Sequence, residues 1–148
     1  MYQRILVAVD GSSTAECALN EAMKLARDGG SVLLLLHVNE EPVMLTLEDN
    51  WVLPQELLDQ LEENGRKILA RAQEKVTAAG IASETRQVND ASQRIGAVIA
   101  EEADDWKAEV IVLGTHGRKG VDRLLLGSVA EDVARLAAMP VLLVRENK

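Results

Sequence analysis

Residues 5–16, Ile-Leu-Val-Ala-Val-Asp-Gly-Ser-Ser-Thr-Ala-Glu, decide the fold class of this 148-residue chain. The unbroken aliphatic run at residues 5–9 predicts a strand that is buried on both faces, as the strands of parallel sheets are. Asp10-Gly11 ends the strand. Ser13 and Glu16 then have the spacing of a helix capping box, in which each side chain satisfies a free backbone N–H. The stretch therefore predicts a buried strand followed directly by a helix.

The same alternation continues along the whole chain. Apolar runs predict further strands at residues 32–38, 110–113 and 141–144, and a weaker, charged alternation predicts an edge strand at 83–88. Helical spacing of apolar residues predicts helices from residue 13 to the glycine pair at 29–30, then at 57–79, 95–106 and 129–137. Residues 39–56 show no clear period, and the sequence gives no role for them.

Strands that alternate with helices form a parallel sheet, with helices on both faces and right-handed crossovers. We therefore expect an α/β fold in which residues 1–148 form a single domain. The expected sheet is doubly wound, with five parallel strands in the order 3-2-1-4-5. Such sheets bind ligands where the strand order reverses. Here that place lies between the loops that start at Asp10 and Gly114.

Composition excludes several classes of protein. The chain is 47% apolar and 27% charged, which is typical of a globular domain. No apolar run reaches the roughly 18–20 residues of a membrane span, and the amino terminus does not resemble a signal peptide. A single cysteine, Cys17, excludes an intrachain disulfide, so we expect a cytoplasmic protein. The net charge of −8 and only three aromatic residues argue against nucleic-acid binding.

The loop after the fourth strand carries the clearest binding signal. It has the pattern Gly-x2-Gly-x9-Gly-Ser, formed by Gly114, Gly117, Gly127 and Ser128 just before the last helix. Glycines let backbone N–H groups approach an anion, and the start of a helix adds unpaired donors and a positive dipole end. The loop is also locally basic, since Arg118, Lys119 and Arg123 outnumber Asp122. The pattern predicts phosphate binding, in which Ser128 acts as a phosphate contact, a helix cap or both.

This loop, the opening strand with Asp10-Gly11-Ser12, and the closing run at residues 140–144 resemble the universal stress protein family over essentially the whole chain. The glycine spacing is similar to that of its ATP-binding branch. The resemblance implies a Rossmann-like fold, ATP at the switch point, and Mg²⁺ or Mn²⁺ bridging the phosphates. It also implies a homodimer paired through the last strands, which agrees with the apolar character of a final edge strand.

The resemblance further assigns roles by position. Asp10 would contact the ribose, and Ala8 and Val38 would line the adenine site or bond the base through backbone groups. The ribose and phosphates would be held by four residues of the loop and the last helix, with a backbone donor from a fifth: Gly114, Gly117, Gly127, Ser128 and Val129.

Three functions remain open from the sequence. The first is an ATP-binding regulatory switch in a stress response, which acts through unidentified protein partners. The second is a slow ATPase or nucleotidyl-transfer enzyme, although no catalytic residue is identifiable, and His116 has no carboxylate partner that the sequence can place. The third is a dimeric interaction module with an empty pocket. The sequence does not reveal the triggering stress, the partner, or the metal.

Overall fold

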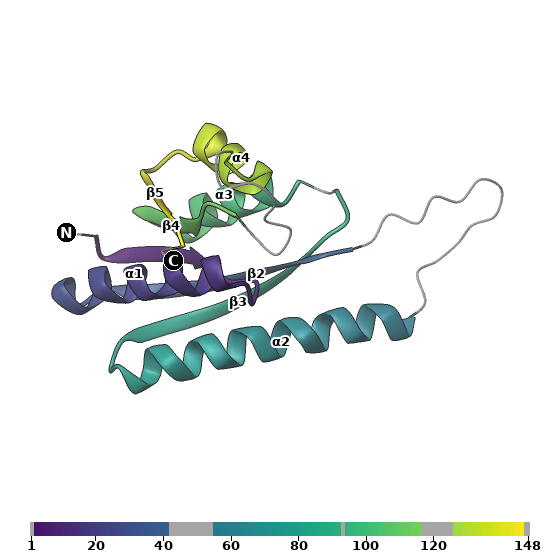
Figure 1. The fold of residues 1–148 in the computed structure, drawn as a ribbon, viewed down its shortest axis with the longest axis horizontal. Helices are drawn as coiled ribbons and strands as arrows, with labels where there is room; N and C mark the ends of the chain where they lie inside the picture. The colour runs from purple at the N-terminus through teal and green to yellow at the C-terminus, as the bar shows by residue number, and fades with distance from the viewer. Residues whose placement is uncertain (1, 42–54, 93, 117–125, 147–148) are drawn as a thin grey trace.

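A computed structural model describes residues 2–41, 55–92, 94–116 and 126–146. Its strands form one parallel sheet in the order β3-β2-β1-β4-β5 (Figure 1). The strands are β1 (Arg4–Ala8), β2 (Val32–Glu40), β3 (Ala82–Asp90), β4 (Val110–Gly114) and β5 (Val141–Val144). This topology confirms the expected fold class. It also means that the order of strands reverses between β1 and β4 at the centre of the sheet.

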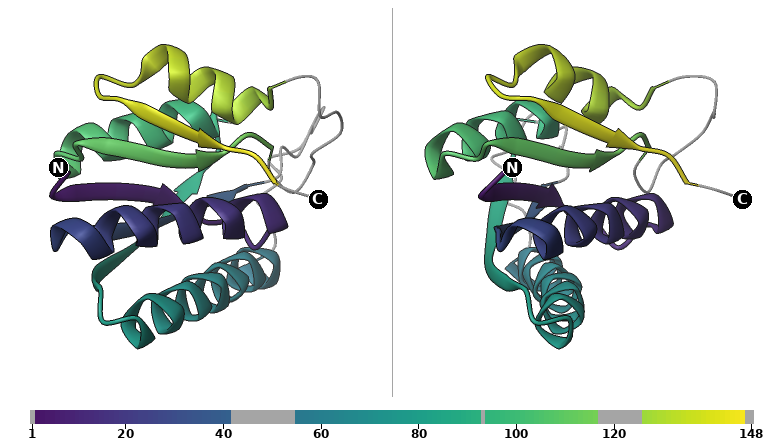
Figure 2. Two further views of the ribbon diagram at one scale, coloured as in Figure 1. Left: turned by 60° about the vertical axis from the view of Figure 1, so that its left-hand side comes forward. Right: turned by 90° about the vertical axis from the view of Figure 1, so that its left-hand side faces the viewer.

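Helices cover both faces of the sheet, as Figure 2 shows. They are α1 (Ser13–Gly29), α2 (Gln55–Ala78), α3 (Ile95–Trp106) and α4 (Ser128–Leu136). Side chains that alternate along the strands bury two separate cores, Ile5 and Val7 against α1 and α2, and Leu6 against α3 and α4. None of the described helices is both long and apolar enough to cross a membrane.

The start of α1 differs from the expected capping box. The N-cap is Ser12, whose side chain accepts a hydrogen bond from the Ala15 N–H at 3.1 Å. Gly11 has φ 83°, and the Asp10 carboxylate accepts from the Ser12 N–H at 2.8 Å, so the turn places Ser12 in the cap position. The prediction of a cap at Ser13 is therefore wrong by one residue. Glu16 forms an ion pair with Lys75 of α2 instead.

Strands β2 and β3 run further than the sequence predicted. The expected ends were residues 38 and 88, but the two strands stay in register to the pair of Glu40 and Asp90. Asn39 Nδ2 donates to Asn89 Oδ1 at 2.9 Å, which joins the two strands beyond their apolar section. Because β1 ends at Ala8, beside Leu36, the last residues of β2 have no β1 neighbour.

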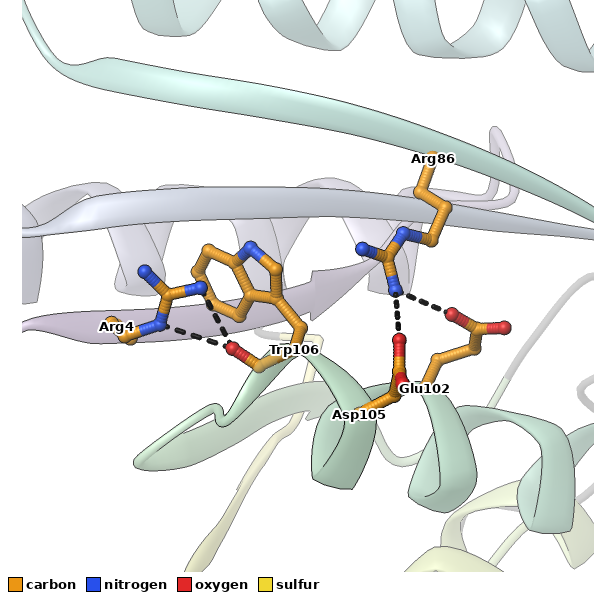
Figure 3. A network of polar contacts seen from close by, with 5 residues as sticks. All are labelled: Arg4, Arg86, Glu102, Asp105 and Trp106. Carbon is orange, nitrogen blue, oxygen red and sulfur yellow. Dashed lines mark hydrogen bonds and ion pairs between the residues drawn. The ribbon is translucent and has the colours of Figure 1, made fainter.

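Polar contacts from the start of β1 and from the middle of β3 hold α3 against the sheet (Figure 3). The Arg4 guanidinium lies 4.0 Å from the ring centroid of Trp106 and donates to the Trp106 carbonyl at 2.7 and 3.1 Å. Arg86 of β3 pairs with Glu102 at 2.6 Å and with Asp105 at 3.5 Å. Trp106 Nε1 is the one fully buried side-chain nitrogen or oxygen without a hydrogen bond in the described part of the chain. These contacts fix α3, whose other end contributes to the candidate site.

Candidate functional site

A pocket of about 800 Å³ opens at the carboxyl ends of the central strands, where the strand order reverses. Seven of the eight residues predicted to contact a ligand line it: Ala8, Asp10, Val38, Gly114, Gly127, Ser128 and Val129. The eighth, Gly117, lies outside the described residues, as do the basic side chains of Arg118, Lys119 and Arg123. The structure thus brings together side chains and backbone that are more than a hundred residues apart in the sequence.

Asp10 stands at the mouth of the pocket, immediately after β1. One carboxylate oxygen, Oδ1, is occupied by the Ser12 N–H at 2.8 Å. The other, Oδ2, makes no hydrogen bond to the described residues and is available to a ligand. The carboxylate can therefore hold the turn through one oxygen and still offer the other to the pocket. The capping bond also fixes the direction in which the second oxygen points.

Val38 exposes a backbone edge to the same pocket. Val9 N–H donates to the Leu36 carbonyl at 2.9 Å, so the amide groups of Leu36 point toward β1. Alternate residues of a strand direct their amide groups to the same side, so those of Val38 point that way too. Val9 follows the last residue of β1, and its carbonyl oxygen lies 2.8 Å from Nδ1 of His37. Among the described residues no backbone bond reaches the Val38 N–H or C=O from that side.

The two glycines at the ends of the phosphate-type loop have packing reasons of their own. A Cβ on Gly114 would lie 2.6 Å from Thr14 Cγ2 and 3.1 Å from the Thr14 carbonyl oxygen. A Cβ on Gly127 would lie 2.8 Å from the carbonyl oxygen of Thr115, to which the Gly127 N–H donates at 2.8 Å. The loop therefore closes at its base, and both glycines permit close backbone approach whether or not a ligand is bound.

Helix α4 presents its amino terminus to the pocket. Its N-cap is Gly127, and Ser128 is the first helical residue, so of the two roles expected for Ser128 the helix cap is contradicted. The reason is geometric, because a cap residue precedes the first helical turn and here that residue is a glycine without a side chain. The Ser128 hydroxyl makes no hydrogen bond to the described residues, and it lies beside the free N–H groups of the first turn. This arrangement suits an anion.

Helix α2 supplies a wall that the sequence reasoning did not predict. Leu61, Asn64 and Ile68 lie on one helical face and line the pocket. Behind them Gly65 approaches the sheet so closely that a Cβ there would lie 2.8 Å from His37 Cδ2 and 2.7 Å from Asn39 Oδ1. Polar residues at 37 and 39 in an otherwise apolar strand were the available signal. They share one face of β2.

The described lining is acidic. Its ionisable side chains are three carboxylates and two imidazoles: Asp10, Glu40, Asp132, His37 and His116. Asp132 is paired with Arg135 at 2.6 Å, and no lysine or arginine belongs to the described lining. Within the described ranges no group of three or more histidine, cysteine, aspartate or glutamate side chains could hold a metal ion. Any positive charge from described groups comes from backbone N–H donors and the α4 dipole.

The sequence matches the model of the universal stress protein family over residues 1–145. Universal stress protein YxiE of Bacillus subtilis is 33% identical, over 98% of this chain and 100% of that protein. The chain belongs to the universal stress protein family. The resemblance on which the sequence analysis relied is thereby confirmed at the level of the family.

Solved structures of this family share the fold. The universal stress protein UspA from Lactobacillus plantarum superposes with a TM-score of 0.82 at 25% identity, covering 97% of this chain and 98% of that one. A universal stress protein in complex with cAMP gives a TM-score of 0.69 at 29% identity, and one from Archaeoglobus fulgidus in complex with dAMP gives 0.70 at 26%. Both complexes cover 97% of this chain and 98% of the other.

Proposed function

We propose that this family member binds ATP in the pocket at the strand ends and acts as a nucleotide-dependent regulatory protein in a stress response. The observation that carries the proposal is the amide edge of Val38, which has no backbone partner on the β1 side among the described residues. It offers one donor and one acceptor side by side, at a place where β1 has ended and a flat ring can enter the plane of the sheet. Adenine has the complementary pair, an acceptor at N1 and a donor at the 6-amino group.

The remaining groups of a nucleotide find partners in order along the pocket. The ribose hydroxyls lie within reach of Asp10, whose second carboxylate oxygen is unused. The phosphates meet the amino terminus of α4, where the Ser128 hydroxyl and the N–H groups of Ser128 and Val129 have no hydrogen-bond acceptor among the described residues. Ala8 contributes an apolar contact next to the base. A Mg²⁺ or Mn²⁺ ion, if bound, is held mainly by the phosphates and water, since the described lining offers few ligands.

The relatives support the chemistry of the ligand at a coarser level. The two complexes named above contain cAMP and dAMP, which share the adenine ring and one phosphate. Our choice of ATP rests on the glycine spacing of the loop at 114–128, which is similar to that of the ATP-binding branch of the family. A ligand changes the state of a protein only when it binds two conformations unequally. The proposal therefore requires that ATP alters a surface that a partner or a second copy recognises.

We place the protein in the cytoplasm as a homodimer that forms through β5. This strand is an edge of the sheet, and its exposed Leu142 is 39% accessible. An apolar edge strand favours pairing with another strand, and a symmetric pair satisfies both copies at once. The single cysteine, Cys17, agrees with a reducing compartment.

The test is to purify the protein without added nucleotide, denature it, and identify any released small molecule by chromatography and mass spectrometry. Titration of the emptied protein with ATP, GTP and adenosine follows, using calorimetry. Stoichiometric ATP, or ATP binding that is tighter than GTP binding, supports the proposal. Released ADP points to hydrolysis and favours the slow ATPase. No release, together with no heat from any of the three ligands, overturns the proposal in favour of an interaction module.

A further inference from the structure

The pocket contains a polar atom that the proposed ATP contacts leave unused, Nε2 of His37. His37 lines the pocket and is only 7% exposed. Its Nδ1 lies 2.8 Å from the Val9 carbonyl oxygen, which can only accept a hydrogen bond. Nδ1 must therefore carry the proton. In the neutral imidazole, Nε2 is then a bare acceptor.

Nε2 of His37 is not fully buried, and the residue lines the pocket. Trp106 Nε1 is the one completely buried side-chain nitrogen or oxygen that lacks a hydrogen bond in the described part of the chain. Nε2 of His37 also lacks a hydrogen bond among the described residues, but it is not one of the fully buried atoms. It is therefore accessible to a ligand in the pocket that His37 lines. The ring cannot turn freely, because the Val9 bond holds one side and Gly65 of α2 lies against Cδ2 on the other. A buried acceptor that is fixed in this way calls for a donor from the ligand.

We infer that Nε2 of His37 accepts a hydrogen bond from the exocyclic amine of the bound base and makes the pocket prefer purines that carry this amine. The inference rests on the proposed adenine-nucleotide site. The 6-amino group of adenine has two N–H donors. The Val38 carbonyl takes one, and the second needs another acceptor in a site this enclosed.

His37 is better placed for that second bond than the other nearby acceptor. Asn39 donates through Nδ2 to Asn89, which leaves Oδ1 as its acceptor. The bond to Asn89 directs the Asn39 side chain toward β3, on the side of β2 away from β1. His37 immediately precedes Val38, and the Val9 carbonyl holds its ring beside the point where β1 leaves the sheet. A base with a carbonyl oxygen in place of the amine would direct a lone pair at Nε2, which is repulsive.

Two substitutions distinguish the contribution of Nδ1 from that of Nε2. An asparagine amide extends as far from the backbone as Nδ1, so His37→Asn keeps a donor for Val9 and removes the acceptor at Nε2. A glutamine amide extends as far as Nε2, so His37→Gln keeps an acceptor at that position and serves as the matched control. Both variants are first compared with the wild type by thermal unfolding. Each is then titrated with ATP and with purine riboside 5′-triphosphate, which lacks the amine.

We expect the wild type and His37→Gln to bind ATP about fivefold more tightly than the analogue through this bond, and His37→Asn to lose that part of the preference. If His37→Asn keeps the full preference, this inference is overturned while the ATP proposal stands. If the wild type binds neither ligand, both fail together.

A measurement on the wild type covers the case in which neither variant folds. The ¹⁵N resonances of the His37 imidazole should show a protonated Nδ1 and an unprotonated Nε2. On addition of ATP the Nε2 resonance should move in the direction of an accepted hydrogen bond, and the analogue should leave it in place. An Nε2 signal that responds equally to both ligands contradicts the inference.

Discussion

The imidazole Nδ1 of His37 lies 2.8 Å from the carbonyl oxygen of Val9, and this side-chain bond ends the pairing of β1 with β2. Val9 still donates its N–H to the Leu36 carbonyl at 2.9 Å. The Val9 carbonyl would be the next acceptor of the β1–β2 ladder, but it accepts from the His37 imidazole instead. Within the described ranges, the backbone of Val38 therefore keeps a donor and an acceptor without a partner at the reversal point of the sheet. One histidine thus satisfies a buried carbonyl and leaves the adjacent edge open to a ligand.

The first prediction concerns Gly65, which lets α2 approach this part of the sheet. Gly65→Ala gains about 1 kcal/mol of helix propensity. Its Cβ would lie 2.5 Å from Gln87 Nε2 and 2.8 Å from His37 Cδ2, in a region whose polar groups are fixed by hydrogen bonds. Overpacking of this kind costs about 1–3 kcal/mol. We therefore expect a net loss of unfolding free energy in urea denaturation.

The control for this variant is Lys67→Ala, an exposed position on the same helix. It should change the free energy of unfolding by less than about 0.5 kcal/mol. A Gly65→Ala protein that is as stable as Lys67→Ala, or more stable, would contradict the close packing of α2. Because Leu61, Asn64 and Ile68 line the pocket, the variant should also bind ATP more weakly than the control does.

A second prediction compares the two neighbouring serines at the start of α1. Ser12→Ala removes the side chain that accepts from the Ala15 N–H, and loss of such a cap costs about 1 kcal/mol. Ser13→Ala changes the first helical residue and should cost less than about 0.5 kcal/mol. Thermal and urea unfolding of the two variants measure the difference. Equal losses, or a larger loss at Ser13, would argue for the cap that the sequence alone predicted.

The sequence predicted the fold well because buried parallel strands and amphipathic helices leave strong periodic signals. Residues 5–9 and 110–113 could hardly belong to any other element. Once the strand order was known, the reversal point brought Asp10 and Gly114 together. The shift of the α1 cap by one residue was not predictable, since Ser12 and Ser13 are chemically identical. The choice between them depends on the positive φ of Gly11 and the bond from the Ser12 N–H to Asp10.

The α2 wall and the role of His37 could not be predicted for a different reason. They depend on contacts between segments that the sequence separates, and on which groups of a strand remain unpaired. His37 and Asn39 are polar residues in an apolar strand, but the sequence does not show which element packs on them. The structure shows that Gly65 of α2 does. Glycine spacing predicted a phosphate-binding loop, and the described ends of that loop, Gly114 and Gly127, line the pocket. It did not reveal that Gly114 and Gly127 are also required for backbone packing.

A third prediction tests the proposed dimer. The wild type should be a dimer in light scattering at micromolar concentration, and Leu142→Glu should be a monomer, because the substitution places a charge on the exposed edge strand. Leu142 does not line the pocket, so the affinity for ATP should stay within about twofold, or roughly 0.4 kcal/mol. Gln60→Glu on α2 adds the same charge at an exposed site and should remain a dimer. A monomeric wild type, or a dimeric Leu142→Glu, would refute pairing through β5.

The last prediction separates the two functions that a glycine of the 114–128 loop can have. Gly114→Ala places a Cβ 2.6 Å from Thr14 Cγ2 and 3.1 Å from Thr14 backbone, where α1 meets the end of β4. It should lower the free energy of unfolding by about 1–3 kcal/mol even without a ligand. Gly117→Val acts on the residue that the sequence pattern assigns to phosphate approach. It should weaken ATP binding at least tenfold, or about 1.4 kcal/mol, and leave the stability of the ligand-free protein nearly unchanged.

Titration with adenosine makes this comparison decisive, since adenosine has no phosphates. Gly117→Val should bind adenosine as the wild type does, because Asp10 and Val38 are untouched. Ser128→Ala should behave in the same way with a smaller loss for ATP, about fivefold for one hydrogen bond, and with an unchanged melting temperature, because the N-cap is Gly127. If Gly117→Val retains full affinity for ATP, the loop does not hold the phosphates. If it loses adenosine as well, the substitution acts through the fold and the phosphate assignment loses its support.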